Sequence, residues 1–146
     1  MTLEELENVL PNGLHDARVS RIAIDYEKRQ LAIDLEVWVG ETGSDADELR
    51  EAYRPGQVLI HGLVFAVLEP PDPRYNFSNS AALTIDGCDM RKNLSAELTS
   101  SLPADAFFRS LWVNQWNAFI HIGARNVELV WTGNSSVRRE KPEASS

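Results

Sequence analysis

The sequence has a single cysteine, Cys88, so no disulfide can form within the chain. It also has no apolar run approaching the length of about 18 residues that a membrane-spanning helix needs. The longest such run, residues 58–68, is interrupted by His61 and Gly62. These absences exclude a disulfide scaffold and predict that the protein has no membrane partner.

Motifs typical of the common enzyme classes are also missing. The sequence has neither the Gly-x-Ser-x-Gly string of serine hydrolases nor the His-Glu-x-x-His string of zinc peptidases. Its eight glycines are scattered singly, so no glycine-rich loop could wrap a phosphate group. Cys88 lies between Asp86 and Asp89, whose negative charges disfavour a reactive thiolate. We therefore predict no enzyme activity, no catalytic residue, no metal and no cofactor.

Positive charge is scarce: 14 Lys and Arg stand against 22 Asp and Glu, for a net charge of -8. A chain of this charge repels nucleic-acid phosphates, and its densest basic stretch, residues 138–141, contains Glu140. The acidic residues 1–7 lack the apolar segment of an export signal. The sequence thus predicts a cytoplasmic protein that binds no nucleic acid, and it favours a basic protein partner.

The clearest hydrophobic pattern lies in residues 31–39. Odd-numbered positions there are aliphatic and even-numbered ones are mostly polar, which predicts a strand with one buried face. Residues 17–25 alternate more loosely, and the polar residues 26–29 between the two segments predict a β-hairpin. The aliphatic positions are Leu31, Ile33, Leu35, Val37 and Val39, and Trp38 is expected on the opposite, wet face.

The other predicted elements are shorter. A helix is expected at residues 2–10, where Thr2 and Glu5 form a capping box, and a second at 103–111, where a proline fits the first turn. Residues 94–101 give no clear pattern. A strand is predicted at 58–68, consistent with burial on both faces or with a bulge at Gly62. Further strands are predicted at 81–85, and at 118–122 and 127–131 as a second hairpin. Residues 47–53 could make one or two helical turns, and residues 54–56 carry a turn signal.

These patterns together predict a mainly β protein, α+β by count. About six antiparallel strands should form a barrel or a sandwich with two short flanking helices. One globular domain, residues 1–132, is followed by a flexible polar tail, residues 133–146. An exposed edge strand would permit a dimer, and the sequence leaves the oligomeric state open.

Three histidines, His15, His61 and His121, are the first metal ligands to consider. A three-histidine zinc site with an open position would support a metal-dependent hydrolase, but only the fold could bring these distant residues together. His61 and His121 each stand in a predicted strand, which favours partly buried side chains that hydrogen-bond a neighbour. A metal-dependent hydrolase is therefore the least favoured of the functions considered.

The segment 13–17 contains the adjacent pair His15 and Asp16. In an extended segment their side chains would point to opposite faces and could not act as one acid–base pair. We expect Asp16 to cap a turn by accepting backbone N–H bonds, and His15 to pack or to donate to a carbonyl. The functional alternative is that this pair contacts a partner, or that His15 is a general base.

Four tryptophans offer a second candidate binding surface. Trp38 is expected on a wet face, Trp112 and Trp116 lie one helical turn apart in sequence, and Trp131 ends the last predicted strand. Each could pack in the core or anchor a protein partner on an acidic rim. In an alternative interpretation, Trp38, Phe65 and Trp131 line the cavity of a barrel that binds a small apolar ligand.

The string Leu14-His15-Asp16-Ala17, followed by a strand, a short polar turn and an alternating second strand, resembles a pattern in small bacterial β-rich proteins. Among these are immunity proteins of polymorphic toxin systems, which carry a similar string at the entry to the first hairpin. The resemblance covers about the first 40 residues. It implies a non-catalytic bacterial domain that binds and blocks a toxin.

Overall fold

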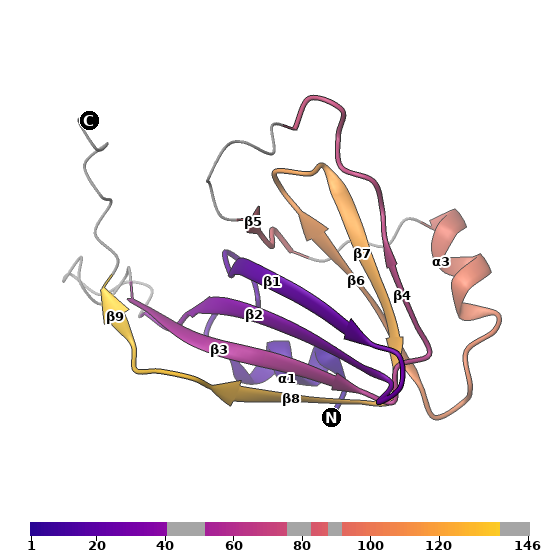
Figure 1. Ribbon diagram of the computed structural model, residues 1–146, viewed down its shortest axis with the longest axis horizontal. Helices are drawn as coiled ribbons and strands as arrows, with labels where there is room; N and C mark the ends of the chain where they lie inside the picture. The colour runs from indigo at the N-terminus through magenta and orange to yellow at the C-terminus, as the bar shows by residue number, and fades with distance from the viewer. Residues whose placement is uncertain (41–51, 76–82, 88–91, 138–146) are drawn as a thin grey trace.

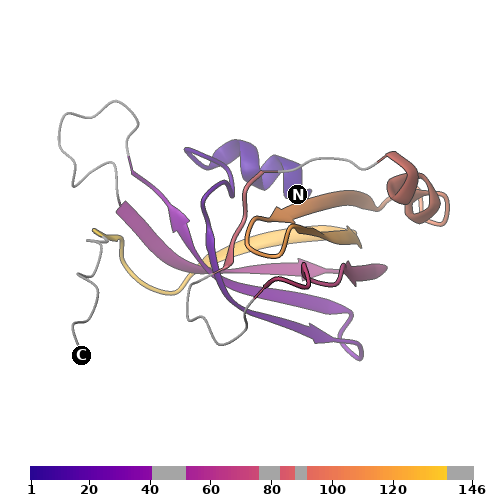
Figure 2. The same ribbon diagram turned by 90° about the horizontal axis from the view of Figure 1, so that it is seen from above.

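The computed structural model describes residues 1–40, 52–75, 83–87 and 92–137. This part of the chain is mainly β and forms two antiparallel sheets that pack as a sandwich and not as a closed barrel (Figures 1 and 2). No helix in these ranges is long and apolar enough to cross a membrane. The elements are α1 (Leu3–Val9), β1 (Arg18–Asp25), β2 (Gln30–Trp38), β3 (Ala52–His61), β4 (Phe65–Leu68), β5 (Leu83–Thr84), α3 (Lys92–Thr99), β6 (Phe107–Val113), β7 (Ala118–Ala124), β8 (Asn126–Trp131) and β9 (Ser136–Val137).

The larger sheet has the strand order β5-β1-β2-β3-β8, with β9 pairing to the start of β3. The smaller sheet has the order β4-β7-β6. The predicted hairpin is confirmed as β1 and β2, which pair in antiparallel register from Asp25↔Gln30 onward. In its turn, one carboxylate oxygen of Asp25 accepts the N–H groups of Glu27 and Lys28, both at 3.0 Å.

The predicted alternation of β2 is also confirmed. Leu31, Ile33, Leu35 and Val37 are all buried in the core, and Val39 packs at its margin. Burial of an aliphatic side chain contributes about 1.5–3 kcal/mol, so this face holds much of the sandwich together. The neighbouring strand β3 adds to the same face, because Val58 and Ile60 pair with Ile33 and Leu31.

The strand predicted over residues 58–68 is bent into β3 and β4, which belong to different sheets. The bend lies at Gly62, whose φ of +61° suits glycine. Between the pairs His61↔Asn126 and Phe65↔Gly123, the bent strand contains one residue more than its partner. This is a bulge of the kind that lets a strand pass from one sheet to the other.

The predicted hairpin of residues 118–122 and 127–131 is wrong. These residues form β7 and β8, but β7 pairs with β4 and β6 while β8 pairs with β3. The corner lies at Arg125, between the end of β7 and the start of β8. There the strand passes from one sheet to the other without reversing direction, as the paired strand does at Gly62. A turn-like sequence therefore marked a bend and not a hairpin.

Two other local predictions are wrong. Residues 107–111 belong to β6 and not to a helix, because both faces of this strand carry apolar or buried side chains that obscure its period of two. The predicted turn at residues 54–56 lies inside β3. On one side, β3 pairs with β9 up to Tyr53 and with β8 from Gly56 onward. Pro55 is tolerated because it lies in the gap between these two paired stretches.

The remaining expectations have mixed outcomes. Residues 94–99, which gave no clear pattern, belong to α3. The segment predicted as a flexible tail, residues 133–146, contains β9, so residues 136–137 are part of the larger sheet. Residues 52–53 are strand and not helix, while 47–51, 81–82 and 138–146 lie outside the described residues.

The first helix, α1, begins as predicted, because Thr2 Oγ1 accepts the N–H of Glu5 at 3.1 Å. Its buried residues, Leu3 and Leu6, join the core. Glu7 then ties α1 to β6, since its Oε2 accepts Arg109 Nη2 at 2.7 Å. Burial raises the pKa of Glu7 above its ordinary 4.5, although the Arg109 guanidinium acts in the opposite direction.

This pKa shift predicts how stability depends on pH. The folded protein binds a proton at Glu7 more tightly than the unfolded chain, so ionised Glu7 lowers stability as the pH rises above 4.5. The variant Glu7→Gln cannot titrate, and we expect it to gain stability relative to the wild type as the pH rises above the ordinary pKa of 4.5. Urea unfolding on both sides of this pH, with Glu5→Gln as control on the same helix, measures the difference. A difference that is constant or opposite in sign contradicts the prediction.

Candidate functional site

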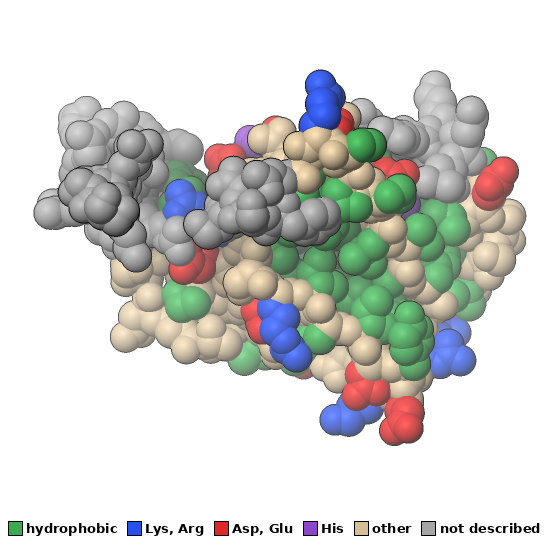
Figure 3. Space-filling view, turned by 45° about the horizontal axis from the view of Figure 1, so that its top comes forward, with side chains coloured by type: hydrophobic (Ala, Val, Ile, Leu, Met, Phe, Trp, Pro, Cys, Tyr) green, Lys and Arg blue, Asp and Glu red, His purple; other side chains and the backbone are tan. Residues whose placement is uncertain are grey.

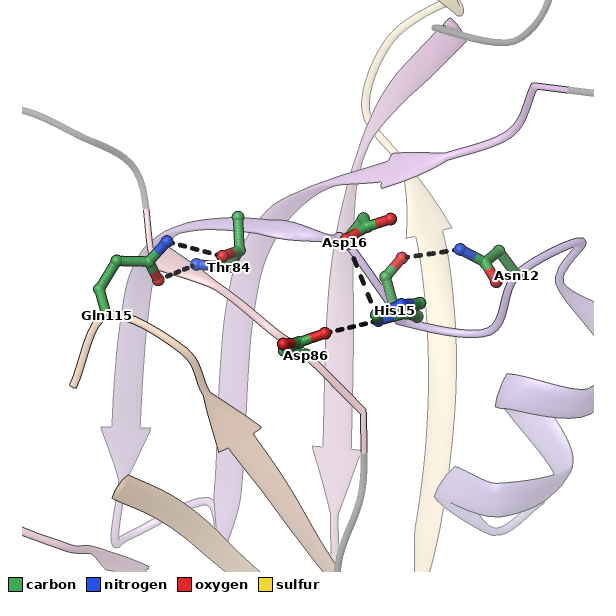
Figure 4. Close-up of polar contacts among 6 residues, drawn as sticks. All are labelled: Asn12, His15, Asp16, Thr84, Asp86 and Gln115. Atoms are coloured by element: carbon green, nitrogen blue, oxygen red, sulfur yellow. Dashed lines mark hydrogen bonds and ion pairs between the residues drawn. The ribbon is translucent and has the colours of Figure 1, made fainter. Parts of the chain in front are cut away.

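Three exposed side chains from two distant segments meet beside the first strand: His15, Asp16 and Asp86. His15 Nδ1 lies 3.2 Å from Asp86 Oδ1 and 4.0 Å from Asp16 Oδ1. Figure 4 shows the imidazole between the two acidic residues. The side chains are 46%, 57% and 45% exposed in that order, so all three can contact a molecule from solution. We call this group the His15 cluster.

The backbone around Asp16 explains how these side chains come together. Asp16 has a φ of +65°, a left-handed conformation that Asp tolerates better than most residues. The segment is therefore not extended, and the expectation that His15 and Asp16 point to opposite faces is wrong. The Asp16 carboxylate contacts His15 and caps no backbone N–H in the described part of the chain. The expected turn-capping role of Asp16 is thus also wrong.

Backbone hydrogen bonds fix the position of the cluster. The N–H of Asp16 donates to the carbonyl of Ile85 at 2.8 Å, and the N–H of Ile85 donates to Ala17 at 3.0 Å. On the other side, Asp86 N–H donates to the carbonyl of Trp112 at 2.9 Å. Residues 83–87 thereby connect the edge of the larger sheet to β6 of the smaller one. The cluster lies at this junction and not on a free loop.

Side-chain bonds reinforce the junction. Gln115 donates to Thr84 Oγ1 and accepts the Thr84 N–H, both at 2.7 Å (Figure 4). Asn12 Nδ2 donates to the carbonyl of His15 at 3.4 Å. The two flanks of the His15 cluster are therefore both held by amide side chains.

The chemistry available to the cluster is that of two carboxylates and one imidazole. Their three ligand atoms lie within 4.8 Å of one another, close enough for one positively charged group to contact all of them. That group could be a divalent cation or a Lys or Arg side chain. Exposed acidic groups of this kind are common without an ion, so the arrangement alone does not define a metal centre.

A second polar group is buried in the smaller sheet. His121 Nδ1 lies 2.7 Å from Ser110 Oγ, and His121 Nε2 lies 3.3 Å from Glu69 Oε2. The other oxygen of Glu69 accepts the N–H of Phe119 at 2.8 Å. Because an ionised carboxylate can only accept, neutral His121 would carry its proton on Nε2 and accept the Ser110 hydroxyl at Nδ1. The group thus joins β6 and β7 to the residue that follows β4.

This Ser110–His121–Glu69 chain has the residue types of a hydrolytic triad but not its access. Ser110 is 0% exposed and His121 is 1% exposed, so no substrate carbonyl can approach the hydroxyl in this arrangement. The rings of Phe108 and Phe119 stack on the imidazole, with centroids 6.1 and 5.6 Å away. The arrangement favours a structural role, as the sequence predicted for His121.

The three histidines do not converge. Within the described ranges, His15 contacts Asp86, His61 lies 2.9 Å from Glu128, and His121 is enclosed in the smaller sheet. Each imidazole therefore has a different acidic partner, and the three-histidine metal site considered from the sequence is not formed. Sequence reasoning identified His15 and Asp16 but missed Asp86, because no local signal reveals a contact between such distant residues.

The tryptophans are largely engaged within the fold. Trp38 is 8% exposed, so its placement on a wet face is wrong. Trp112 packs edge-on against Phe119 at 4.8 Å, and Trp116 packs against the core. The guanidinium of Arg54 covers Trp131, 4.5 Å from its ring.

The alternative apolar cavity is also not supported. Trp38 and Trp131 belong to the larger sheet and Phe65 to the smaller one, and Trp131 packs against the hydrophobic core cluster. The described residues do line a hollow of about 530 Å³, but it is open and lies over β1, β2 and β3. Its lining contains none of the three aromatic residues: it consists of Ala23, Ile24, Asp25, Tyr26, Glu27, Gln30, Ala32, Gln57 and Leu59.

Comparison with known proteins gives no relative: no protein-family model, curated protein or solved structure matches this chain. The resemblance of residues 14–17 and the first hairpin to immunity proteins therefore stays a prediction.

Proposed function

We propose that the protein is a non-catalytic binding protein that accepts a basic segment of a protein partner at the His15 cluster. The observation that carries this proposal is the convergence of two exposed carboxylates on one imidazole at a fixed junction between the sheets. A lysine or arginine side chain supplies the positive charge and the N–H donors that such a group attracts.

In the described part of the chain, the carboxylates of the cluster have no basic side-chain partner other than the imidazole. Asp34, Asp72 and Asp105 each contact an arginine, and Arg74 lowers the pKa of Asp72 to about 2. Among the described residues, Asp16 and Asp86 are paired with neither Lys nor Arg. They can therefore receive a cationic group without first breaking an internal ion pair with such a residue.

Charge over the rest of the molecule supports the same partner. The net charge of -8 attracts a basic protein at long range and raises its rate of encounter. On the face shown in Figure 3, acidic and basic side chains are both scattered around a largely hydrophobic and neutral centre. Specific recognition is then local, and the His15 cluster provides it. If the resemblance to immunity proteins holds, the partner is a bacterial toxin and the site of action is the cytoplasm.

The test measures binding to candidate partners, the products of neighbouring genes, by calorimetry. We expect the double variant Asp16→Asn/Asp86→Asn to bind a basic partner at least about tenfold more weakly, since it loses two charge-assisted contacts. The control, Glu5→Gln/Glu27→Gln, removes the same charge from exposed positions elsewhere and should lose far less affinity. Equal losses in both variants, or no binding by any of these products, would count against the proposal.

A further inference from the structure

The strand β1 has one long side without a strand partner in the described part of the chain. It pairs with β2 along its length, but β5 covers only Arg18 and Val19 on the other side. A bulge follows at Ser20, where the register with β2 shifts. Residues 20–25 therefore form an edge whose backbone groups can pair with another strand (Figure 1).

The sequence of this edge is complementary to itself. Residues 21–25 read Arg-Ile-Ala-Ile-Asp. When two copies of β1 run antiparallel with Ala23 on the twofold axis, Arg21 of each copy stands opposite Asp25 of the other. Ile22 likewise stands opposite Ile24. Opposite residues in antiparallel strands share a face and contact each other, so this register gives two ion pairs and two aliphatic pairs.

The side chains concerned are available for these contacts. Arg21 is 63% exposed, and its contact with Asp34 is long, at 3.5 Å. The turn bonds of Asp25 use only Oδ1, which leaves Oδ2 for an arginine. Ile22 and Ile24 lie at the margin of the core and are only partly buried. Pairing would cover more of both isoleucines.

The outer edge at β8 does not offer the same match. The N–H of Val127 is already bonded to the carbonyl of Met1 at 2.9 Å. The only charged residue of β8 is Glu128, so two copies of this strand would bring like charges together or none at all. Self-complementary charge therefore distinguishes β1.

We propose that two copies of this protein associate through antiparallel pairing of β1 residues 21–25, which joins their larger sheets across a twofold axis. Such an interface is isologous, since the same residues serve both partners. One short strand buries less than the roughly 1,200 Å² of a standard interface, so the dimer is weak. This association uses residues other than the His15 cluster and does not depend on the proposed function.

A charge-reversal series tests the proposal by sedimentation equilibrium at protein concentrations up to about 1 mM. We expect a dissociation constant in the high micromolar range for the wild type. Arg21→Asp and Asp25→Arg each place like charges opposite one another twice, and each should weaken the dimer at least about tenfold. The double variant Arg21→Asp/Asp25→Arg restores opposite charges and should return to within about threefold of the wild type.

The control Lys28→Asp changes the net charge by the same amount as Arg21→Asp but lies in the turn beyond the paired segment. It should leave the dimer unchanged within about threefold. Arg21→Asp also retains the turn bonds of Asp25, so its result stands even if Asp25→Arg fails to fold. A wild type that is monomeric at every concentration, a double variant as weak as the single ones, or an equal loss in Lys28→Asp overturns the proposal.

Discussion

Replacing His121 with leucine is expected to lower the free energy of unfolding by about 2–5 kcal/mol. The leucine fills much of the same volume but removes the acceptor of the Ser110 hydroxyl and the ring N–H that faces Glu69. His121 and Ser110 are buried, so water cannot readily replace the lost bonds. The loss of these two buried contacts, and not a change in packing, is the source of this loss of stability.

The companion variant Ser110→Ala separates the loss of the Ser110–His121 hydrogen bond from a change in packing. Alone it should cost about 1–3 kcal/mol, because it leaves Nδ1 of His121 without this hydroxyl. In the double variant Ser110→Ala/His121→Leu neither partner of this bond remains, so its loss should be smaller than the sum of the single losses by about 0.5–3 kcal/mol. Urea unfolding monitored by tryptophan fluorescence gives the free energy of unfolding of the three variants. The dependence of this free energy on urea concentration should be the same in all of them. Losses that simply add would show that the bond is not what stabilises the sheet.

Local patterns predicted the parts of the fold that depend on local chemistry. Alternation in residues 31–39 gave the buried face of β2, and the capping box at Thr2 gave the start of α1. The mainly β class and the antiparallel arrangement followed from these short strands and turns. In each case the neighbours along the chain carry the signal, so the sequence is sufficient.

Sheet membership could not be predicted in the same way. In the sequence, the strand that bends at Gly62 looks like one long strand, and the strand that bends near Arg125 looks like a hairpin. In both cases turn-forming residues stand between two apolar runs, and this pattern does not tell a bend from a turn. Residues 107–113 carry apolar or buried side chains on both faces, which removes the period that separates strand from helix. Only the pairing of distant segments decides these cases.

The candidate site shows the same limit. His15 and Asp16 were recognisable as an unusual pair, but the left-handed conformation of Asp16 and the approach of Asp86 are consequences of the junction between the sheets. Glu69 and Ser110 gave no signal at all, because each is an ordinary polar residue until the fold places it beside His121. The sequence predicted residue types, and long-range pairing determined which of them meet.

The close packing of the smaller sheet predicts a second large effect, at Gly123. A Cβ atom at this position would lie 2.6 Å from Cε1 of Phe65 and 2.9 Å from Cδ2 of Leu102, distances that real Cβ atoms do not adopt. Gly123 pairs with Phe65 on one side and with Phe108 on the other, so the backbone has little room to move away. We expect Gly123→Ala to lower the free energy of unfolding by about 1–3 kcal/mol, and Gly123→Val by more.

Three further variants, Gly56→Ala, Phe65→Ala and Phe65→Ala/Gly123→Ala, show whether this contact is the cause. Gly56→Ala is the matched control, because it lies in a strand of the larger sheet and its nearest neighbours would be 3.1 Å away, which asks for only a small adjustment. In the background of Phe65→Ala, which removes the opposing ring, Gly123→Ala should cost little, so the two losses fall well short of additive. Thermal and urea unfolding of the wild type, Gly123→Ala and these three variants give the losses. If Gly123→Ala costs as much without the Phe65 ring as with it, the loss of stability comes from the change in the glycine backbone and not from the contact with this ring.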